Sequence, residues 1–346
     1  MSRRRIFLDE SPGETRGVVT LDGRPERLLL RRDDDDLRLA LGARLAARVS
    51  EVEPALATAF LDLGGGAEAV MPFKPDERPV RGQMLEIEIR GEPRRDKLAV
   101  ARPVSRTDGD TRLLVPPQSI GEQLRAIVPD VDVVGGREAR EAADEAEAEA
   151  LAMLHPLAGG GTLSIEPTRA LTALDVDLGA RKGADAKRVT RQANLAALGM
   201  AARLLRLKGL GGIIVIDLAG RGHDGPALSA AARAAFAPDN PGVAFGPISR
   251  FGTLEISVPR RTRPVLERLC REDGAPSDRT LAQRLVRRLQ SEGQAQPGAQ
   301  LTASCAPDVA AAARPLVERL AGQAGARFTV AAVPTLDRER LEVASR

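Results

Sequence analysis

Three aspartates, Asp175, Asp177 and Asp217, have the spacing and the flanking residues of a carboxylate site. Asp175 and Asp177 lie in ALTALDVDLG, which has the pattern of a β-strand, so both side chains should project from the same face. Asp217 ends the apolar run GGIIVID, which predicts a buried strand, at the carboxyl edge where open α/β sheets usually bind ligands. If the two strands are neighbours, three carboxylates converge, and such like charges resist ionising together unless a cation lies among them.

Magnesium is the cation that these residues predict. Its preferred ligands are oxygen atoms and retained waters, and neither strand carries a His or Cys that would hold zinc. The ion would orient a water for attack on a phosphodiester and would stabilise the charge on the phosphoryl and leaving oxygens. An Asp at the end of a strand also commonly caps the following turn, and the spacing alone leaves this structural alternative open.

A basic, glycine-bearing loop, GARKGADAKR, lies between the two strands and opens a helix. Its cations would grip the phosphate backbone of a nucleic acid beside the ion; they are Arg181, Lys182, Lys187 and Arg188. An ordinary solvated basic loop is the alternative, and the sequence does not decide between the two.

An alternating α/β unit over residues 161–270 is expected to position these side chains. Its predicted strands are GTLSIEP, ALTALDVDLG, GGIIVIDLAG and a final pair, VAFGPIS and TLEISV. The helices AKRVTRQANLAALGMAARLLRLKG and PALSAAARAAFA alternate with them.

The preceding residues predict strands and a small barrel. Residues 1–38 alternate short apolar runs with turn signals, as antiparallel strands do. Residues 39–103 contain five short strands, which suggest a barrel of the OB type, a fold that commonly presents one face to single-stranded nucleic acid. Phe60 and Phe73 are the rings that could stack on bases there, and Lys97 could hold a phosphate; both rings could instead fill the barrel, which we favour for Phe73.

The remaining segments complete the domain organisation. Residues 104–160 are interpreted as a connector with a short strand, VPDVDVV, and an Ala-rich helix, and residues 276–346 as a compact α+β module. No run of about 18 apolar residues occurs, and MSRRR leads directly into IFLDES, so we predict neither a membrane span nor a signal peptide and expect a cytoplasmic protein.

Composition limits how this chain would bind a nucleic acid. Of its 346 residues none is Trp or Tyr and 7 are Phe, so a nucleic-acid surface must depend on Arg, Lys and backbone amides. The 51 basic residues are mostly Arg, which suits phosphate partners, although a codon bias toward Arg would explain the excess equally well.

Three blocks in the same order resemble the catalytic core of the ribonuclease E/G family: ALTALDVDLGARKG, ARLLRLKGLGGIIVIDLAG and PISRFGTLEIS. In that family the first strand reads Asp-x-Asn and the second ends in Val-Ile-Asp, and the two Asp side chains bind magnesium. The resemblance therefore implies catalytic and metal-binding roles for Asp175 and Asp217. It places Asp177, as a third metal-site residue, where the family has a supporting Asn, and the extra negative charge could tighten the ion or misplace it.

The flanking segments extend the resemblance. EVEPALATAFLDLG looks like the start of the family's OB-fold domain, which implies RNA contacts for Phe60 and Lys97, whereas a second family aromatic falls on Val70. IFLDES and VDVVGG look like two parts of a split RNase H-like domain. The implied fold is a multidomain α/β and α+β protein: an OB-fold barrel inserted in a reduced RNase H-like domain, then a DNase-I-like α/β catalytic domain and a small α+β domain.

Two parts of the family are missing from this sequence. We find no sensor pocket for the RNA end after LLVPPQ, and of the family's Cys-Pro-x-Cys zinc link only Cys270 remains. We therefore expect a shortened family member that forms a monomer or dimer instead of a zinc-linked tetramer, because sharing one zinc between two subunits needs a thiolate pair from each.

The resemblance implies a magnesium-dependent endoribonuclease that acts on single-stranded ribosomal, transfer or messenger RNA. The alternative is a catalytically weak or inactive RNA-binding scaffold that keeps the nuclease fold. The replacement at Asp177 and the missing parts favour the scaffold. The two retained ligand positions and the basic loop favour the nuclease.

Overall fold

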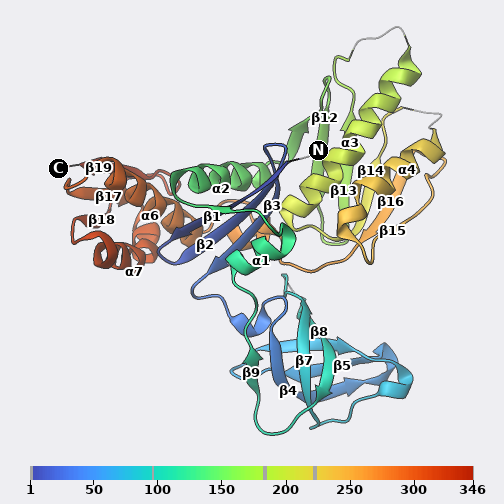
Figure 1. The fold of residues 1–346 in the computed structure, drawn as a ribbon, viewed down its shortest axis with the longest axis horizontal. Helices are drawn as coiled ribbons and strands as arrows, with labels where there is room; N and C mark the ends of the chain where they lie inside the picture. The colour runs from blue at the N-terminus through green and yellow to red at the C-terminus, as the bar shows by residue number, and fades with distance from the viewer. Residues whose placement is uncertain (1–2, 96, 182–184, 221–223, 346) are drawn as a thin grey trace.

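The computed structural model describes residues 3–95, 97–181, 185–220 and 224–345. Figure 1 shows a central sheet from which three lobes extend: the barrel below, the C-terminal module on the left and the α/β domain at the upper right. Within the described ranges, no helix has the length and apolar character needed to cross a membrane.

The N-terminal residues form the central antiparallel sheet predicted for residues 1–38. Its strands, in the order β10-β1-β2-β3, are β1 (Arg4–Ser11), β2 (Glu14–Leu21), β3 (Arg24–Arg32) and β10 (Val133–Val134), which runs parallel to β1. Ile6 and Phe7 point to opposite faces, so Ile6 packs in the cluster of helix α1 (Ile120–Ile127) and Phe7 in that of helix α2 (Gly136–Leu151). The segments IFLDES and VDVVGG therefore do belong to one sheet.

A closed barrel follows the sheet. Its strands are β4 (Arg44–Glu53), β5 (Thr58–Asp62), β6 (Glu68–Pro72), β7 (Met84–Gly91), β8 (Ala99–Arg106) and β9 (Arg112–Val115). The order is β5-β6-β8-β7-β4-β9, and an additional pairing of β5 with β4 closes the ring of five strands, as in an OB-like barrel. The barrel extends past the predicted range 39–103. Strand β8 continues to Arg106, and β9, which follows it in the chain, pairs with β4.

The α/β domain is built on a second sheet. Its elements are β11 (Leu154–Pro156), β12 (Thr162–Pro167), β13 (Thr172–Asp177), α3 (Ala186–Lys208), β14 (Gly212–Asp217), α4 (Gly225–Ala235), β15 (Ala244–Phe245) and β16 (Thr253–Val258). The order is β11-β12-β13-β14-β16-β15, with β13 and β14 parallel and joined through α3. The sheet begins before the predicted start at 161, because the short strand β11 pairs with β12.

The C-terminal module has a core of its own, as the predicted α+β module requires. It contains α6 (Asp278–Ala295), β17 (Leu301–Cys305), α7 (Pro307–Ala324), β18 (Phe328–Ala332) and β19 (Glu342–Ser345), and α5 (Val265–Leu269) leads into it. The remaining helical segments are single 3-10 turns at Leu37–Leu39, Pro54–Leu56, Pro75–Glu77 and Ala237–Asp239.

Buried charges join the central sheet to this module. The Arg16 side chain is fully buried and binds Asp9, with Nη2 2.6 Å from Oδ2, and Glu147 of α2, with Nη1 3.0 Å from Oε2. Arg287 of α6 reaches the same Glu147 at 3.2 Å and also binds Glu14 of β2. A buried charge is tolerated only when it is paired, so this network ties β1, β2, α2 and α6 together.

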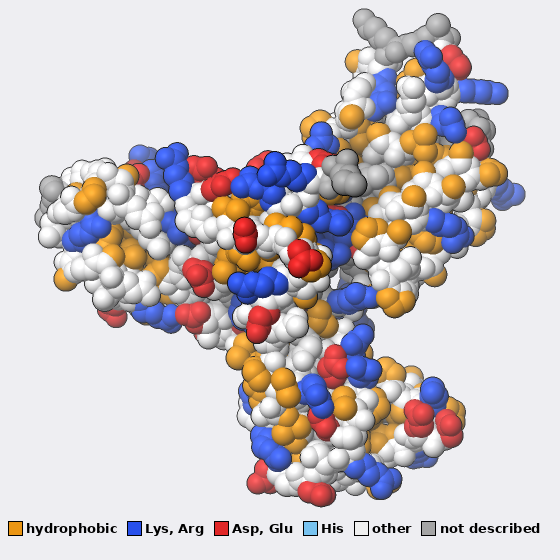
Figure 2. Space-filling model, viewed as in Figure 1, with side chains coloured by type: hydrophobic (Ala, Val, Ile, Leu, Met, Phe, Trp, Pro, Cys, Tyr) orange, Lys and Arg blue, Asp and Glu red, His pale blue; other side chains and the backbone are white. Residues whose placement is uncertain are grey.

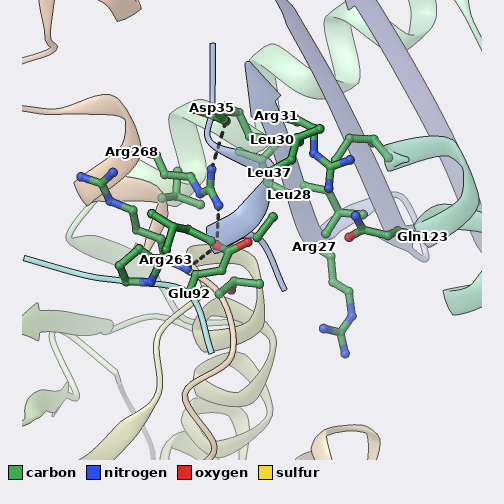
Figure 3. Close-up of a pocket in the computed structure, with 18 of the residues that line it drawn as sticks. Arg27, Leu28, Leu30, Arg31, Asp35, Leu37, Glu92, Gln123, Arg263 and Arg268 are labelled. Carbon is green, nitrogen blue, oxygen red and sulfur yellow. Dashed lines mark hydrogen bonds and ion pairs between the residues drawn. The ribbon is translucent and has the colours of Figure 1, made fainter. Parts of the chain in front are cut away.

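A cavity of about 210 Å³ lies where the central sheet, the barrel and the α/β domain meet (Figure 3). Glu92 has a central place among its charged residues: it accepts the Arg263 backbone N–H at 2.9 Å and binds Arg268, which lies 3.6 Å from Asp35. Such mutual pairing is typical of a joint between domains.

Candidate active site

Asp175 and Asp217 lie side by side on adjacent parallel strands. The register of β13 and β14 places these two residues directly opposite each other. On each strand the neighbours toward the core, Leu174, Val176 and Ile216, are buried, while both aspartates are exposed. Neighbouring strands are about 4.8 Å apart, so two carboxylates on the same face at one register position are within reach of a single ion.

The electrostatics of the pair reflect this closeness. Burial raises the pKa of Asp175, and the negative charges of Asp217, Asp177 and Glu166 raise it further, against a bond from the Val176 backbone that lowers it. A cation between the carboxylates would offset this repulsion.

Asp177 shares the face of Asp175 but also has a local bond. Its Oδ1 accepts the backbone N–H of Gly179 at 2.9 Å, which is the turn-capping role that the sequence left open. Among the residues that the structure describes, no group of three or more His, Cys, Asp or Glu side chains is arranged to hold a metal ion. The donor set that fits magnesium is therefore the pair Asp175 and Asp217, because this ion is commonly held by one or two carboxylates together with waters and substrate phosphates.

The sequence reasoning missed Asn194, which positions the segment after Asp217. This side chain of α3 is 1% exposed, its Nδ2 donates to the Ala219 carbonyl at 3.1 Å, and its Oδ1 accepts the Ala219 N–H at 3.0 Å. The signal was present in the sequence, since Asn194 is a polar residue within the buried stripe of α3 that also includes Ala197 and Leu198.

The basic residues of the loop after β13 have different roles. Lys182 lies outside the described residues. Arg181 donates to the carbonyls of Ala158 and Gly160 at 2.5 and 2.6 Å, so it fastens the turn between β11 and β12. Lys187 and Arg188 are exposed in the first turn of α3, where the positive end of the helix adds to their charge.

The barrel presents Phe60 on its outer face. Its neighbours Ala59 and Leu61 point into the barrel core, and the residue directly opposite on β6 is Val70, where the family has a second aromatic. Phe73, by contrast, packs against the barrel core, as we favoured.

Lys97 lies in the turn between β7 and β8, opposite Arg94, and lines a cavity of about 510 Å³ against the α/β domain. Arg260 and Thr172, the first residue of β13, also line this cavity. Thr172 precedes Asp175 by three residues and Asp177 by five, so at 3.3 Å per residue the cavity wall is about 10 Å along β13 from Asp175 and about 16 Å from Asp177. The structure thus does not bring Lys97 and the carboxylates into one site, and Figure 2 shows Lys and Arg spread over all three lobes of this face instead of gathered in one patch.

Fold and site together define a multidomain α/β protein with a carboxylate pair on an open sheet face and an OB-like barrel. Residues 139–261 match the model of the Ribonuclease E/G family. This part of the chain is similar to the ribonuclease E/G family, as the three sequence blocks predicted.

Curated relatives match the same part of the chain. It is 38% identical to Ribonuclease E of Escherichia coli (strain K12) over 107 residues, which are 30% of this chain and 10% of that protein. It is 36% identical to Ribonuclease E of Haemophilus influenzae over 107 residues, or 30% and 11%. It is 34% identical to the chloroplastic Ribonuclease E/G-like protein of Arabidopsis thaliana over 114 residues, or 32% and 11%. The matched region thus spans about a tenth of the length of these relatives.

Proposed function

We propose that this protein is a magnesium-dependent endoribonuclease that cleaves single-stranded ribosomal, transfer or messenger RNA during processing or decay. The observation that carries the proposal is the in-register pair Asp175 and Asp217 on the solvent-facing side of the sheet. Two protein carboxylates at an exposed position leave room for waters and for the phosphate oxygens of a substrate.

The chain's own residues would divide the work as follows. Asp175 and Asp217 would hold magnesium, which when bound supplies Lewis-acid stabilisation of a phosphodiester and an activated water. Asn194 keeps the segment after Asp217 in place through Ala219. Lys187 and Arg188, exposed at the start of α3, would bind the phosphates that flank the cleaved bond.

The barrel would hold a more distant part of the same RNA strand. Phe60 offers a ring on the outer face for stacking, and Lys97 a charge for a phosphate. Because the cavity of Lys97 lies at the far end of β13, an RNA that contacts both places would pass along the α/β domain.

A binding scaffold without turnover is the second candidate. It is favoured by the carboxylate of Asp177 at the position of the family's Asn, and by the lack of a three-ligand group among the described residues. Such a protein would bind RNA through the same basic groups without cleaving it.

One experiment separates these functions. Purified protein is incubated with single-stranded RNA with and without magnesium and compared with Asp217→Asn, while Asp110→Asn, an exposed change on the barrel, serves as the matched charge control. We expect cleavage that requires both the metal and Asp217 and that persists in the control. Binding without cleavage under every condition would establish the scaffold, and cleavage that survives Asp217→Asn would exclude this site.

A further inference from the structure

A tight turn ahead of β16 lies against the end of the strand that carries Asp217. In the antiparallel pairing of β14 with β16, Asp217 is opposite Thr253. The N–H of Leu218, the residue after Asp217, donates to the carbonyl of Gly252 at 3.1 Å. The tip of the turn, Arg250 and Phe251, is thereby anchored next to the carboxylate pair.

Phe251 is an exposed ring in a chain that has few. The structure describes all 7 phenylalanines, and Phe251 is the one exposed ring among them, at 76%. Phe7, Phe236 and Phe328 are buried, and the other three rings are half-buried. The ring forgoes the free energy that burial would give it, and its position beside the candidate active site makes it available to a ligand.

The turn holds this ring in a fixed position. Ser249 Oγ accepts the N–H groups of Phe251 and Thr253, each at 3.2 Å, and lies 2.7 Å from Thr253 Oγ1. Gly252 has φ +95°, a value that suits glycine and lets the chain turn back into β16. The Arg250 guanidinium lies over the Phe251 ring, 4.7 Å from its centroid, and supports it from one side.

We propose that Phe251, backed by Arg250, is the platform on which a nucleobase next to the cleaved phosphodiester stacks. This inference rests on the proposed function, since it assigns a contact for the same RNA. The chemistry fits an unpaired base, because every base has a π-face and stacking on a ring tolerates any sequence. Arg250 lies over one side of the ring and Gly252 has no side chain, so the two chain neighbours of Phe251 add no apolar side chain that a protein partner would bury.

The first measurement needs no cleavage. A single-stranded RNA with 2-aminopurine at successive positions is titrated with the full chain in EDTA, and the quenching that accompanies stacking is recorded. We expect one position to be quenched by the wild type and by Phe251→Trp, and not by Phe251→Ala or Phe251→Leu. If Phe251→Leu quenches the 2-aminopurine as strongly as Phe251→Trp does, an apolar side chain without a ring suffices. That result would refute base stacking on Phe251.

The second measurement uses cleavage in magnesium. Phe251→Ala should lower kcat/KM by about 5- to 150-fold, the range expected for the loss of one base-stacking contact. Removing the stacked base, through an abasic nucleotide at the position found by quenching, should lower the wild-type value by a similar factor and leave Phe251→Ala nearly unaffected. Independent effects of the two changes would refute the platform even in an active nuclease. If the wild type does not cleave at all, the proposed nuclease fails while the quenching still decides on Phe251.

Discussion

Asp177→Asn tests whether the third carboxylate acts on the ion. The change removes one negative charge and keeps the side chain's shape, and the Asn Oδ1 can still accept the Gly179 N–H that Asp177 accepts at 2.9 Å. The turn should therefore survive, so that the loss of charge is the main consequence.

Strand geometry gives the size of the effect. Side chains two residues apart on a strand are separated by about 6.6 Å. At that distance a divalent cation and one carboxylate interact by about 1.3 kcal/mol in water, which corresponds to about an eightfold change in affinity. At about 0.15 M salt, screening over a Debye length of about 8 Å reduces this to two- or threefold.

We therefore expect Asp177→Asn to need about eight times more magnesium for half-maximal RNA cleavage at low ionic strength, and two to three times more at 0.15 M salt. Binding of Mn²⁺, followed by electron paramagnetic resonance, reports the same affinity without turnover. Asp110→Asn, on the barrel, should change neither quantity. An unchanged or lower metal requirement for Asp177→Asn, or an effect that salt does not weaken, would refute the electrostatic role of Asp177.

Two further outcomes are expected. Asn194→Ala removes both hydrogen bonds to Ala219, at a cost of about 2 kcal/mol, so hydrogen exchange at the Ala219 amide should accelerate about 30-fold. The control Gln192→Ala, at an exposed position of the same helix, should leave this exchange rate unchanged. Normal protection of the Ala219 amide in Asn194→Ala would mean that other contacts hold this segment. Lys97→Ala should weaken RNA binding and lower the slope of log affinity against log salt by about one, and an unchanged slope would place the RNA elsewhere than at this turn.

The sequence predicted the local arrangement of the aspartates for a clear reason. Residues two apart share a strand face, and an apolar run that ends in Asp reads as a neighbouring strand, so both Asp175 and Asp217 were expected on one face. The short strands β9 and β11 were not resolved from the sequence, because three or four residues carry too little periodicity.

Long-range contacts account for what the sequence left unknown. The distance of Lys97 from the carboxylates depends on how the barrel docks, which contacts such as Glu92 with Arg268 determine across 176 positions of the chain. A run of basic residues likewise does not show that the Arg181 side chain donates its hydrogen bonds to the carbonyls of another turn. Phe251 belongs to a block that resembles the family, but nothing in the block shows that its ring faces water.

The buried charges of Arg16, Glu14 and Glu147 have a consequence for how this chain can be divided. Glu14 and Arg287 are 273 positions apart, yet each neutralises the other inside the protein. A fragment that ends before α6 would leave Glu14 short of one of its two arginine partners and uncover the face on which the helix packs. The opening sheet therefore completes its buried ion pairs only with the segment around residue 287, and a division of the chain that separates the two would expose an incompletely paired carboxylate.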